Sequence, residues 1–461
     1  MVFSSLNFLF LFFPAVLAVY FLVPFRAKNA VLLLASIFFY AWGEPVYVIL
    51  MMLNILLNYV TGLQMEAASD RRKRKFQLAA GVAVNLLLLG FFKYSGFLVG
   101  IIGDITGITI AWKEPGLPIG ISFYTFQALS YVIDVYRRRV KVQHNLVDFA
   151  AYITMFPQLV AGPIVTYSQI ETQLTSRKIT LAGCGAGLER LILGLSKKVI
   201  LANNLGAMHT QIQAMTDRSV LLAWLGAVAY TLQIYFDFSG YSDMAIGMGK
   251  ILGFQFPENF DFPYLADSIT SFWRKWHMTL SGWFRDYLYI PLGGNRRGAA
   301  RHILNLMIVW FLTGLWHGAG WNFVLWGVYY GILLVLEKYI LDPLLSKAPG
   351  VIRHIYTLFL VNLGWVLFSN TQFGQMTAYL GDMFGAGTGG FADSAFLYYL
   401  KSNLILLILS IIACSPVLRK LLNRISRRSS IAAAVICIVL FLVCTAFLVY
   451  GSYNPFLYFR F

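Results

Sequence analysis

Long apolar stretches alternate with short polar segments along this chain. A helix needs roughly 20 apolar residues to cross a hydrocarbon core of about 30 Å. Stretches of that kind predict spanning helices near residues 5–24, 31–63 (two passes broken at Gly43-Glu44-Pro45), 78–103, 119–136, 220–250, 303–338 (two passes around Gly318), 352–370, 394–414 and 430–450. The pattern therefore predicts an all-α polytopic membrane protein with about 10–12 passes.

The first apolar stretch differs from a secretory signal peptide. No basic residue precedes it, and it carries no small-x-small cleavage site. A removed signal has both features. We therefore expect a retained first helix, with the N-terminus on the outer side of the membrane.

The overall composition strengthens the membrane prediction. Hydrophobic residues make up 59% of the chain and charged residues only 12%. A chain this apolar is not expected to fold as a water-soluble globule. Because no linker, low-complexity tract or internal repeat divides it, we expect a single transmembrane domain over residues 1–461.

The net charge of +16 has two possible explanations, nucleic-acid binding or membrane topology. The basic residues are not gathered on one soluble module, as nucleic-acid binding would require. They lie instead in short segments: Arg26 and Lys28, 71–75, 137–139, and Arg419 to Arg428. These segments fall on one side if the passes alternate, which is the positive-inside pattern of membrane proteins. We therefore expect a lipid bilayer and no nucleic acid as partner.

Two segments between the passes are neither fully apolar nor fully polar. Residues 186–199 carry Leu188, Leu191, Ile192, Leu195 and Val199 at helical spacing, with charged residues pointing elsewhere, which predicts an interfacial amphipathic helix. Residues 255–300 hold the densest mixture of polar and aromatic residues. Broken, partly polar backbone survives at membrane depth only where protein or a water-filled cavity covers it. The mixture therefore predicts a funnel or chamber.

Polar residues also follow single faces of two apolar helices. One stripe consists of Tyr124, Gln127, Tyr131 and Asp134, and the other of Gln233, Asp237 and Tyr241. Each stripe would avoid lipid by facing inward. The stripes either line a substrate path or hydrogen-bond helices to one another, and we favour the second interpretation.

Two histidines lie in apolar, tryptophan-rich sequence and are the main candidates for chemistry. His317 follows Trp316 between two passes and is flanked by glycines that allow close approach of a ligand. Its imidazole is suited to taking a proton from an alcohol and returning it, because it titrates near neutral pH. A structural histidine packed against tryptophans is the alternative, and these residues alone leave both open.

His277 is the more ambiguous candidate. It lies beside Arg274, Lys275 and Trp276, a mixture suited either to an anionic phosphopantetheine or coenzyme A group or to anchoring a helix at the headgroup level. We favour catalysis or substrate contact slightly. An ionisable residue in a membrane-spanning stretch costs free energy unless it is paired or functional, which supports considering both histidines.

The four cysteines do not suggest a metal site. Cys184, Cys414, Cys437 and Cys444 lack the spacing of metal ligands, and the last two lie in an apolar stretch. We expect inert small side chains and no bound metal.

Five segments resemble one known family. They are Pro118-Ile119-Gly120-Ile121-Ser122-Phe123-Tyr124-Thr125-Phe126-Gln127, Phe156-Pro157-Gln158-Leu159-Val160-Ala161-Gly162-Pro163, Tyr235-Phe236-Asp237-Phe238-Ser239-Gly240-Tyr241-Ser242-Asp243-Met244-Ala245, Phe272-Trp273-Arg274-Lys275-Trp276-His277-Met278 and Leu315-Trp316-His317-Gly318-Ala319. In this order they resemble the alginate O-acetyltransferase branch of the membrane-bound O-acyltransferases (MBOAT). The resemblance extends over essentially the whole chain.

The resemblance implies a fold and a set of site residues. The implied fold is a ring of transmembrane helices around a central tunnel, closed by re-entrant and interfacial helices. The histidine of the Trp-His-Gly motif, here His317, is implied as catalytic, and that of Trp-His-Met, here His277, as the second functional histidine. The residues predicted to bind substrate are Arg274, Trp276, Trp316, Asp237, Tyr241 and Asn322.

The resemblance also implies a reaction in a bacterial cytoplasmic membrane. A cytoplasmic acetyl thioester, acetyl-CoA or another, would enter near Arg274, Lys275 and Arg285, and His317 would activate an acceptor hydroxyl. We expect O-acetylation of a cell-surface or secreted polysaccharide, an extracytoplasmic acetyltransferase as partner protein, and no permanently bound cofactor.

Two alternatives remain at this point. D-alanyl transfer from a carrier protein to teichoic acid belongs to the same superfamily, but Ile290-Pro291-Leu292-Gly293-Gly294-Asn295 resembles the acetyltransferase branch more closely. A transporter or flippase without chemistry would often show two related halves, and the sequence contains no such repeat.

Overall fold

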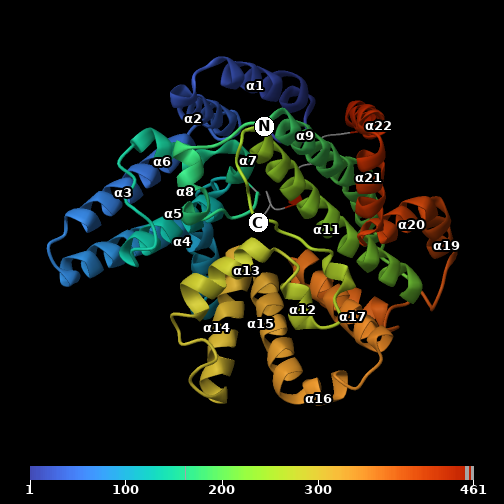
Figure 1. The fold of residues 1–461 in the computed structure, drawn as a ribbon. Coiled ribbons are helices and arrows are strands. Elements are labelled where there is room, and N and C mark those ends of the chain that lie inside the picture. The colour runs from blue at the N-terminus through green and yellow to red at the C-terminus, as the bar shows by residue number, and fades with distance from the viewer. Residues whose placement is uncertain (161, 452–455, 458–461) are drawn as a thin grey trace. The chain divides into compact units, whose positions relative to one another are not determined.

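A computed structural model of the chain describes residues 1–160, 162–451 and 456–457. Within these ranges the regular structure is entirely helical, which confirms the all-α prediction (Figure 1). Seven of the described helices are long and apolar enough to cross a membrane, or eight if the bent pair α19 (Ser394–Ser402) and α20 (Leu404–Ala413) forms one span.

The spanning helices agree closely in position with the predicted passes. The seven candidates are α3 (Tyr47–Ala67), α4 (Arg71–Thr106), α11 (Val220–Ile251), α14 (Ala299–His317), Trp321–Leu345, α17 (Gly350–Ser369) and α22 (Ser430–Tyr450). The count is lower than the number of predicted passes because the helices at three of the predicted positions have fewer than 18 residues. These are Phe8–Leu22, α2 (Phe25–Ala41, 17 residues) and α5 (Ile121–Tyr136, 16 residues).

The described chain divides into two compact units. The first comprises residues 1–191 and 241–257, and the second comprises residues 192–240 and 258–457. Helices α9 (Leu181–Ser196) and α11 contribute residues to both. The prediction of a single domain, and of a ring around a tunnel, stays a prediction.

The first unit contains the helices from α1 (Phe13–Leu22) to α8 (Tyr167–Thr175). Between them lie α6 (Leu146–Thr154) and α7 (Phe156–Leu159), and a π-helical segment, η1 (Phe8–Phe12), precedes α1. Three buried amides join α3 to α4: Asn85 Nδ2 donates to Asn58 Oδ1 at 2.8 Å, and Asn54 Nδ2 donates to Asn85 Oδ1 at 2.8 Å. Buried amides that satisfy one another in this way connect helices in lipid.

Close packing between α9 and α11 in the first unit depends on glycine. A methyl group built on Gly247 would lie 2.6 Å from the Gly187 carbonyl oxygen and 2.7 Å from the Leu191 amide nitrogen. Both atoms belong to backbone, so the helices would have to move apart. Small residues at membrane helix interfaces allow this approach.

Gly247→Ala is therefore expected to lower the free energy of unfolding by about 1–3 kcal/mol through overpacking. The matched control is Gly100→Ala in α4, because no atom lies within 4 Å of its added methyl group. The control should be neutral, or stabilising by about 1 kcal/mol at most. Unfolding of both purified variants in mixed micelles measures the difference, and equal stabilities would contradict the packing argument.

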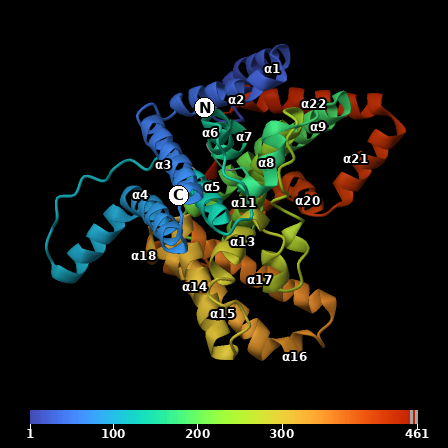
Figure 2. The same ribbon diagram turned by 60° about the vertical axis from the view of Figure 1, so that its left-hand side comes forward.

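The second unit begins with a π-helical segment, η2 (Lys197–Ala202), and α10 (Asn203–Gln213). The short elements η3 (Pro263–Leu265), α12 (Ile269–Trp273), α13 (Met278–Phe284) and η4 (Arg285–Tyr289) precede α14. Helix α15 (Trp321–Leu336), η5 (Glu337–Leu341) and α16 (Asp342–Leu345) follow, and α18 (Phe373–Met383) and α21 (Val417–Arg428) complete the unit. Helices α14 and α15 run side by side, with Gly314 and Gly327 at their contact (Figures 1 and 2).

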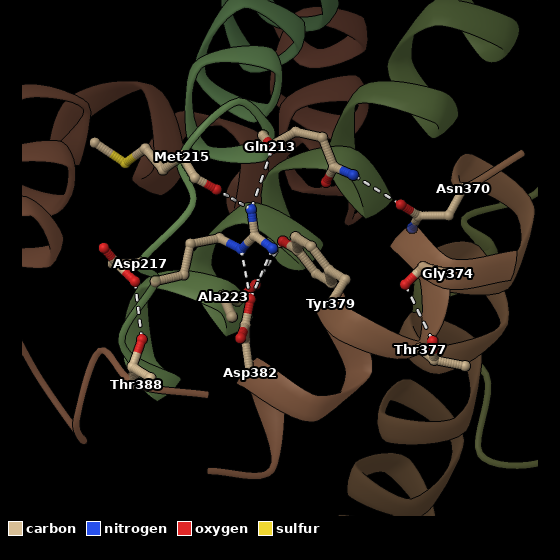
Figure 3. Close-up of polar contacts among 11 residues, drawn as sticks. Gln213, Met215, Asp217, Ala223, Asn370, Gly374, Thr377, Tyr379, Asp382 and Thr388 are labelled. Atoms are coloured by element: carbon tan, nitrogen blue, oxygen red, sulfur yellow. Dashed lines mark hydrogen bonds and ion pairs between the residues drawn. The ribbon is translucent and has the colours of Figure 1, made fainter. Parts of the chain in front are cut away.

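Arg218 connects the segment between α10 and α11 to α18 through contacts with Gln213, Met215 and Asp382, which are labelled in Figure 3. Its guanidinium lies 2.7 Å from the Asp382 carboxylate and donates to the carbonyl oxygens of Gln213 and Met215. It also lies over the Tyr379 ring, whose hydroxyl donates to the Ala223 carbonyl at 2.8 Å. These contacts hold the segment between α10 and α11 against α18.

The segment predicted as an interfacial amphipathic helix buries one of its charged side chains together with its apolar face. Leu191, Ile192, Leu195 and Val199 are buried as expected, but Leu188 is 50% exposed. Lys198, which was expected to point away from the apolar face, is buried and forms an ion pair with Asp237. The ion pair replaces water as the partner of the ammonium group, which the helical spacing could not indicate.

Candidate active site

His317 is the last residue of α14, immediately before the break that separates α14 from α15. The extended backbone of Gly318 and Gly320 ends one helix and begins the next. The imidazole is 3% exposed and lies among aromatic rings, with centroid distances of 5.0 Å to Trp316, 4.9 Å to Trp326 and 5.4 Å to Phe368.

His277 lies at the start of α13 in a conformation that is unusual for its residue type. Its φ of 44° is in the left-handed region, and its side chain is 1% exposed. A residue other than glycine held there stores about 1–3 kcal/mol of strain, and such strain often marks a functional position.

Asn259 determines which nitrogen of His277 carries the proton. The Asn259 Oδ1 atom accepts hydrogen bonds from the Thr279 amide (3.3 Å) and hydroxyl (2.9 Å), so it is the carbonyl oxygen of the side chain. His277 Nδ1 lies 3.0 Å from the same oxygen and must therefore be the donor. Nε2 then carries the lone pair, and within the described residues it is buried without a hydrogen-bond partner.

Burial also controls the charge of His277, which lies outside the candidate spans. It lowers the pKa of the imidazole to about 3. The ring is therefore neutral at physiological pH, the form in which Nε2 can accept a proton or a hydrogen bond.

The two histidines approach the same indole although forty residues separate them in sequence. The Trp316 ring lies 5.0 Å from that of His317 and 5.8 Å from that of His277. The ring of Phe238, from α11, lies 4.7 Å from that of His277 in an edge-to-face contact. The fold thus brings both predicted histidines and Trp316 together.

Glu337 holds the segment that carries His277. Its buried carboxylate accepts hydrogen bonds from the backbone amides of Ile269 (2.6 Å) and Thr270 (2.9 Å) at the N-terminus of α12. A carboxylate there satisfies free amides and complements the helix dipole. We did not single out Glu337 from the sequence, where an acidic residue at the end of an apolar stretch was the one available signal.

The other predicted substrate-binding residues have varied surroundings. Trp276 is buried, with its ring 4.7 Å from that of Trp365. Asn322 Nδ2 donates to the Phe368 carbonyl at 3.0 Å, which places it beside the ring that contacts His317. Arg274 is exposed at the end of α12.

Asp237 and Tyr241 lie on the same helix but in different units. The Asp237 carboxylate lies 2.6 Å from Lys198 Nζ and accepts a hydrogen bond from the Leu457 backbone amide at 2.8 Å. Tyr241 belongs to the first unit, where its ring stacks on Phe3 at 4.4 Å. The known contacts of Asp237 are with the protein itself, so its role in substrate binding stays a prediction.

Two members of the stripe on α5 contact the segment that follows the helix, and two have no such contact among the described residues, so the choice between its two expected uses stays open. The Tyr131 hydroxyl accepts the Gln143 amide at 3.1 Å, and Asp134 lies 3.9 Å from Arg139. By contrast, the Tyr124 hydroxyl and both amide atoms of Gln127 are buried without a hydrogen-bond partner in the described part of the chain. Among the described residues, no group of three or more His, Cys, Asp or Glu could hold a metal ion.

Comparison with known proteins relates this site to one family. The model of the membrane-bound O-acyltransferase family matches residues 135–371, a range that includes both histidines, Asn259 and Glu337. A protein of Azotobacter vinelandii named "Probable alginate O-acetylase AlgI" is 45% identical over 80% of this chain and 75% of its own length. The peptidoglycan O-acetyltransferase of Helicobacter pylori is 34% identical over 80% of this chain and 77% of its own. The teichoic acid D-alanyltransferase of Streptococcus thermophilus is 30% identical over 48% and 56%, respectively.

Proposed function

Because this chain belongs to the membrane-bound O-acyltransferase family, we propose that it moves an acetyl group from an intracellular thioester to a hydroxyl group of a cell-surface or secreted polysaccharide. The chain is a multi-pass membrane protein and an O-acyltransferase. The observation that carries the finer proposal is that two buried histidines contact the same indole, that of Trp316, inside the family-matched range.

His317 is the proposed general base. The acceptor oxygen attacks the thioester carbonyl, the carbon–sulfur bond breaks, and the hydroxyl proton passes through His317 to the departing thiolate. The exchange converts one thioester and one alcohol into one ester and one thiol, so atoms and electrons balance. A positioned base of this kind contributes about 10²–10⁴ to the rate.

His277 is the proposed second functional residue. Its Nε2 lone pair suits acceptance of one hydrogen bond from a substrate N–H or O–H group, because Asn259 keeps the proton on Nδ1. The left-handed backbone and the cap that Glu337 supplies to α12 support this orientation.

The donor and the partners complete the proposal. Acetyl-CoA or another acetyl thioester enters near the exposed Arg274, with Lys275 and Arg285 close in sequence, and no cofactor is bound permanently. The acceptor polysaccharide is reached directly or through an extracytoplasmic acetyltransferase. The enzyme is placed in a bacterial cytoplasmic membrane with its N-terminus outside.

D-alanyl transfer to teichoic acid is the second candidate, since one relative carries that name. The longer and stronger similarity to proteins named as O-acetyltransferases favours acetyl transfer. A transporter without chemistry does not agree with membership of an acyltransferase family.

Donor choice is expected to separate the two transfer reactions. Membranes that contain the protein should move label from radiolabelled acetyl-CoA to glycan, and should leave label on a D-alanyl carrier protein. Mass spectrometry of surface glycans from cells with and without the protein identifies the polymer. Movement of D-alanine in place of acetyl would overturn the proposal.

Asn259→Leu is expected to lower kcat by tenfold or more, a part of the roughly 10²–10⁴ that a well-placed base supplies, because His277 loses its orienting acceptor. Asn259→Asp keeps an acceptor but adds a negative charge that raises the pKa of His277. The acid limb of its pH–rate profile should therefore move to higher pH, since a protonated ring cannot accept.

The matched control for Asn259 is Asn305→Leu. Asn305 is equally buried in the same unit and donates to backbone carbonyls of Leu292 and Gly294. This variant should lose stability while the enzyme that folds keeps the wild-type pH profile. An unchanged profile in Asn259→Asp would show that Asn259 does not act through His277.

A further inference from the structure

Helix α21 separates apolar and basic residues onto two faces. Val417, Leu418, Leu421, Leu422 and Ile425 recur at the spacing of one helix side. The opposite side carries Arg419, Lys420, Asn423, Arg424 and Arg427, and Arg428 ends the helix. This strong segregation describes a helix that lies at a boundary between an apolar and a polar medium.

The charges of α21 have no counterpart in the protein. Its five basic side chains are exposed and form no ion pair within the described part of the chain. No aspartate or glutamate occurs anywhere in the sequence from residue 394 to residue 461. Five uncompensated positive charges on one short helix therefore favour an external anionic partner.

Part of the apolar face is uncovered as well. Val417 is 57% exposed, Leu418 37% and Leu421 49%, whereas Leu422 and Ile425 are half-buried. The packing of α21 is with α20 and α22, the helices that precede and follow it (Figure 2). These three side chains are therefore exposed to water unless a lipid or another molecule covers them.

The neighbouring helix indicates what that covering is. Helix α22 follows α21 after Ser429 and has a mean hydropathy of 3.0 over a window of which only 6% is buried. A helix so apolar and so exposed is surrounded by acyl chains. Helix α21 ends at Arg428, next to the N-terminal end of the lipid-facing α22, and the end of a spanning helix lies at the depth of the phospholipid headgroups.

We propose that α21 lies in the headgroup layer, with Val417, Leu418 and Leu421 in the acyl boundary and its basic side bound to anionic phospholipid headgroups. Phosphodiester oxygens accept from arginine and lysine in this arrangement. The positive-inside pattern assigns the helix to the cytoplasmic leaflet. The inference concerns a lipid-binding surface and does not depend on which acyl group the enzyme transfers.

Fluorescence quenching by labelled lipids tests the proposal. The full-length chain with its four cysteines replaced by alanine carries Leu421→Cys, which is labelled with bimane and reconstituted in nanodiscs. A small fraction of either phosphatidylglycerol or phosphatidylcholine carries a doxyl group near the headgroup end of its acyl chain. We expect phosphatidylglycerol to quench about twofold more strongly or better at equal mole fraction, because the basic helix enriches it locally.

Two variants of matched charge identify the source of that preference. Neutralising Arg419, Lys420, Arg424 and Arg427 to glutamine should make the two lipids quench equally. Neutralising Arg71, Arg72, Lys73 and Lys75 at the start of α4 removes the same charge and should leave the preference intact. If the first variant does not fold, 1 M salt should abolish the preference in the unsubstituted helix, because the Debye length falls to about 3 Å.

Other occupants of α21 give different results. Equal quenching by both lipids in the unsubstituted helix would overturn the anionic preference. Absence of quenching by either lipid would show that protein or water covers Leu421, and would overturn the proposal altogether. A label at Asn423→Cys, on the polar side, should be quenched less than the label at position 421 in every case where the proposal holds.

Discussion

Replacing His317 with alanine is expected to lower acetyl transfer in membranes by about 10²–10⁴, the range that a positioned general base contributes. The physical reason is that the acceptor hydroxyl must lose its proton as it attacks, and no other predicted site residue lies at the break between α14 and α15 with a group that can take it. Initial rates with radiolabelled acetyl-CoA, normalised to the amount of protein, measure the loss. Transfer at the wild-type rate would remove His317 from the chemistry.

His302→Ala is the matched control for this substitution. His302 is on the same helix and is 4% exposed, and its Nδ1 lies 2.7 Å from the Tyr339 hydroxyl. His302→Ala therefore removes a buried imidazole without changing the contacts of Trp316 with His277 and His317. Stability should fall in both variants, but the enzyme that folds should lose transfer only in His317→Ala.

Breaking the buried ion pair between Lys198 and Asp237 is expected to destabilise the protein strongly. The two side chains are 3% and 1% exposed, and their charged atoms are 2.6 Å apart. Asp237→Ala leaves an uncompensated buried ammonium group, which costs about 3–5 kcal/mol. Unfolding in mixed micelles, followed by intrinsic tryptophan fluorescence, measures the difference from wild type.

The control for this pair is an exposed one. Arg353 and Asp267 lie 3.1 Å apart with side chains 35% and 44% exposed, so Asp267→Ala should cost about 1 kcal/mol at most. The double substitution Lys198→Met with Asp237→Leu should regain most of the lost stability. If that stable double variant also transfers acetyl normally, Asp237 does not bind substrate; a stability loss no larger than that of Asp267→Ala would contradict the ion-pair argument.

The spanning helices could be predicted because the lipid environment imposes a simple rule on sequence. The breaks around Gly318 and at Gly43-Glu44-Pro45 both fall where the sequence predicted them, whereas the bend between α19 and α20 interrupts a stretch that was predicted as one pass. Helix α5 (Ile121–Tyr136) likewise begins two residues inside the predicted 119–136 and ends at the predicted residue, where three arginines follow. Hydropathy indicates that a segment avoids water but does not indicate whether lipid or protein surrounds it.

The two histidines of the candidate site could be predicted from the sequence, but the residues that hold them in place could not. His277 and His317 stood out because ionisable residues are costly in apolar sequence. Asn259 and Glu337 act across 18 and 68 residues, respectively, through hydrogen bonds that no local spacing reveals. Lys198 was misjudged for the same reason, since its partner Asp237 is distant in sequence and close only in the folded unit.

The account is tested most directly by acetyl transfer across a sealed membrane. Vesicles that contain the protein, with its cytoplasmic side inward, are loaded with radiolabelled acetyl-CoA and supplied with acceptor polysaccharide and the extracytoplasmic partner outside. We expect label esterified to the external glycan with wild-type protein and background label with His317→Ala. External label still attached to coenzyme A, or equal glycan labelling by His317→Ala, would contradict it.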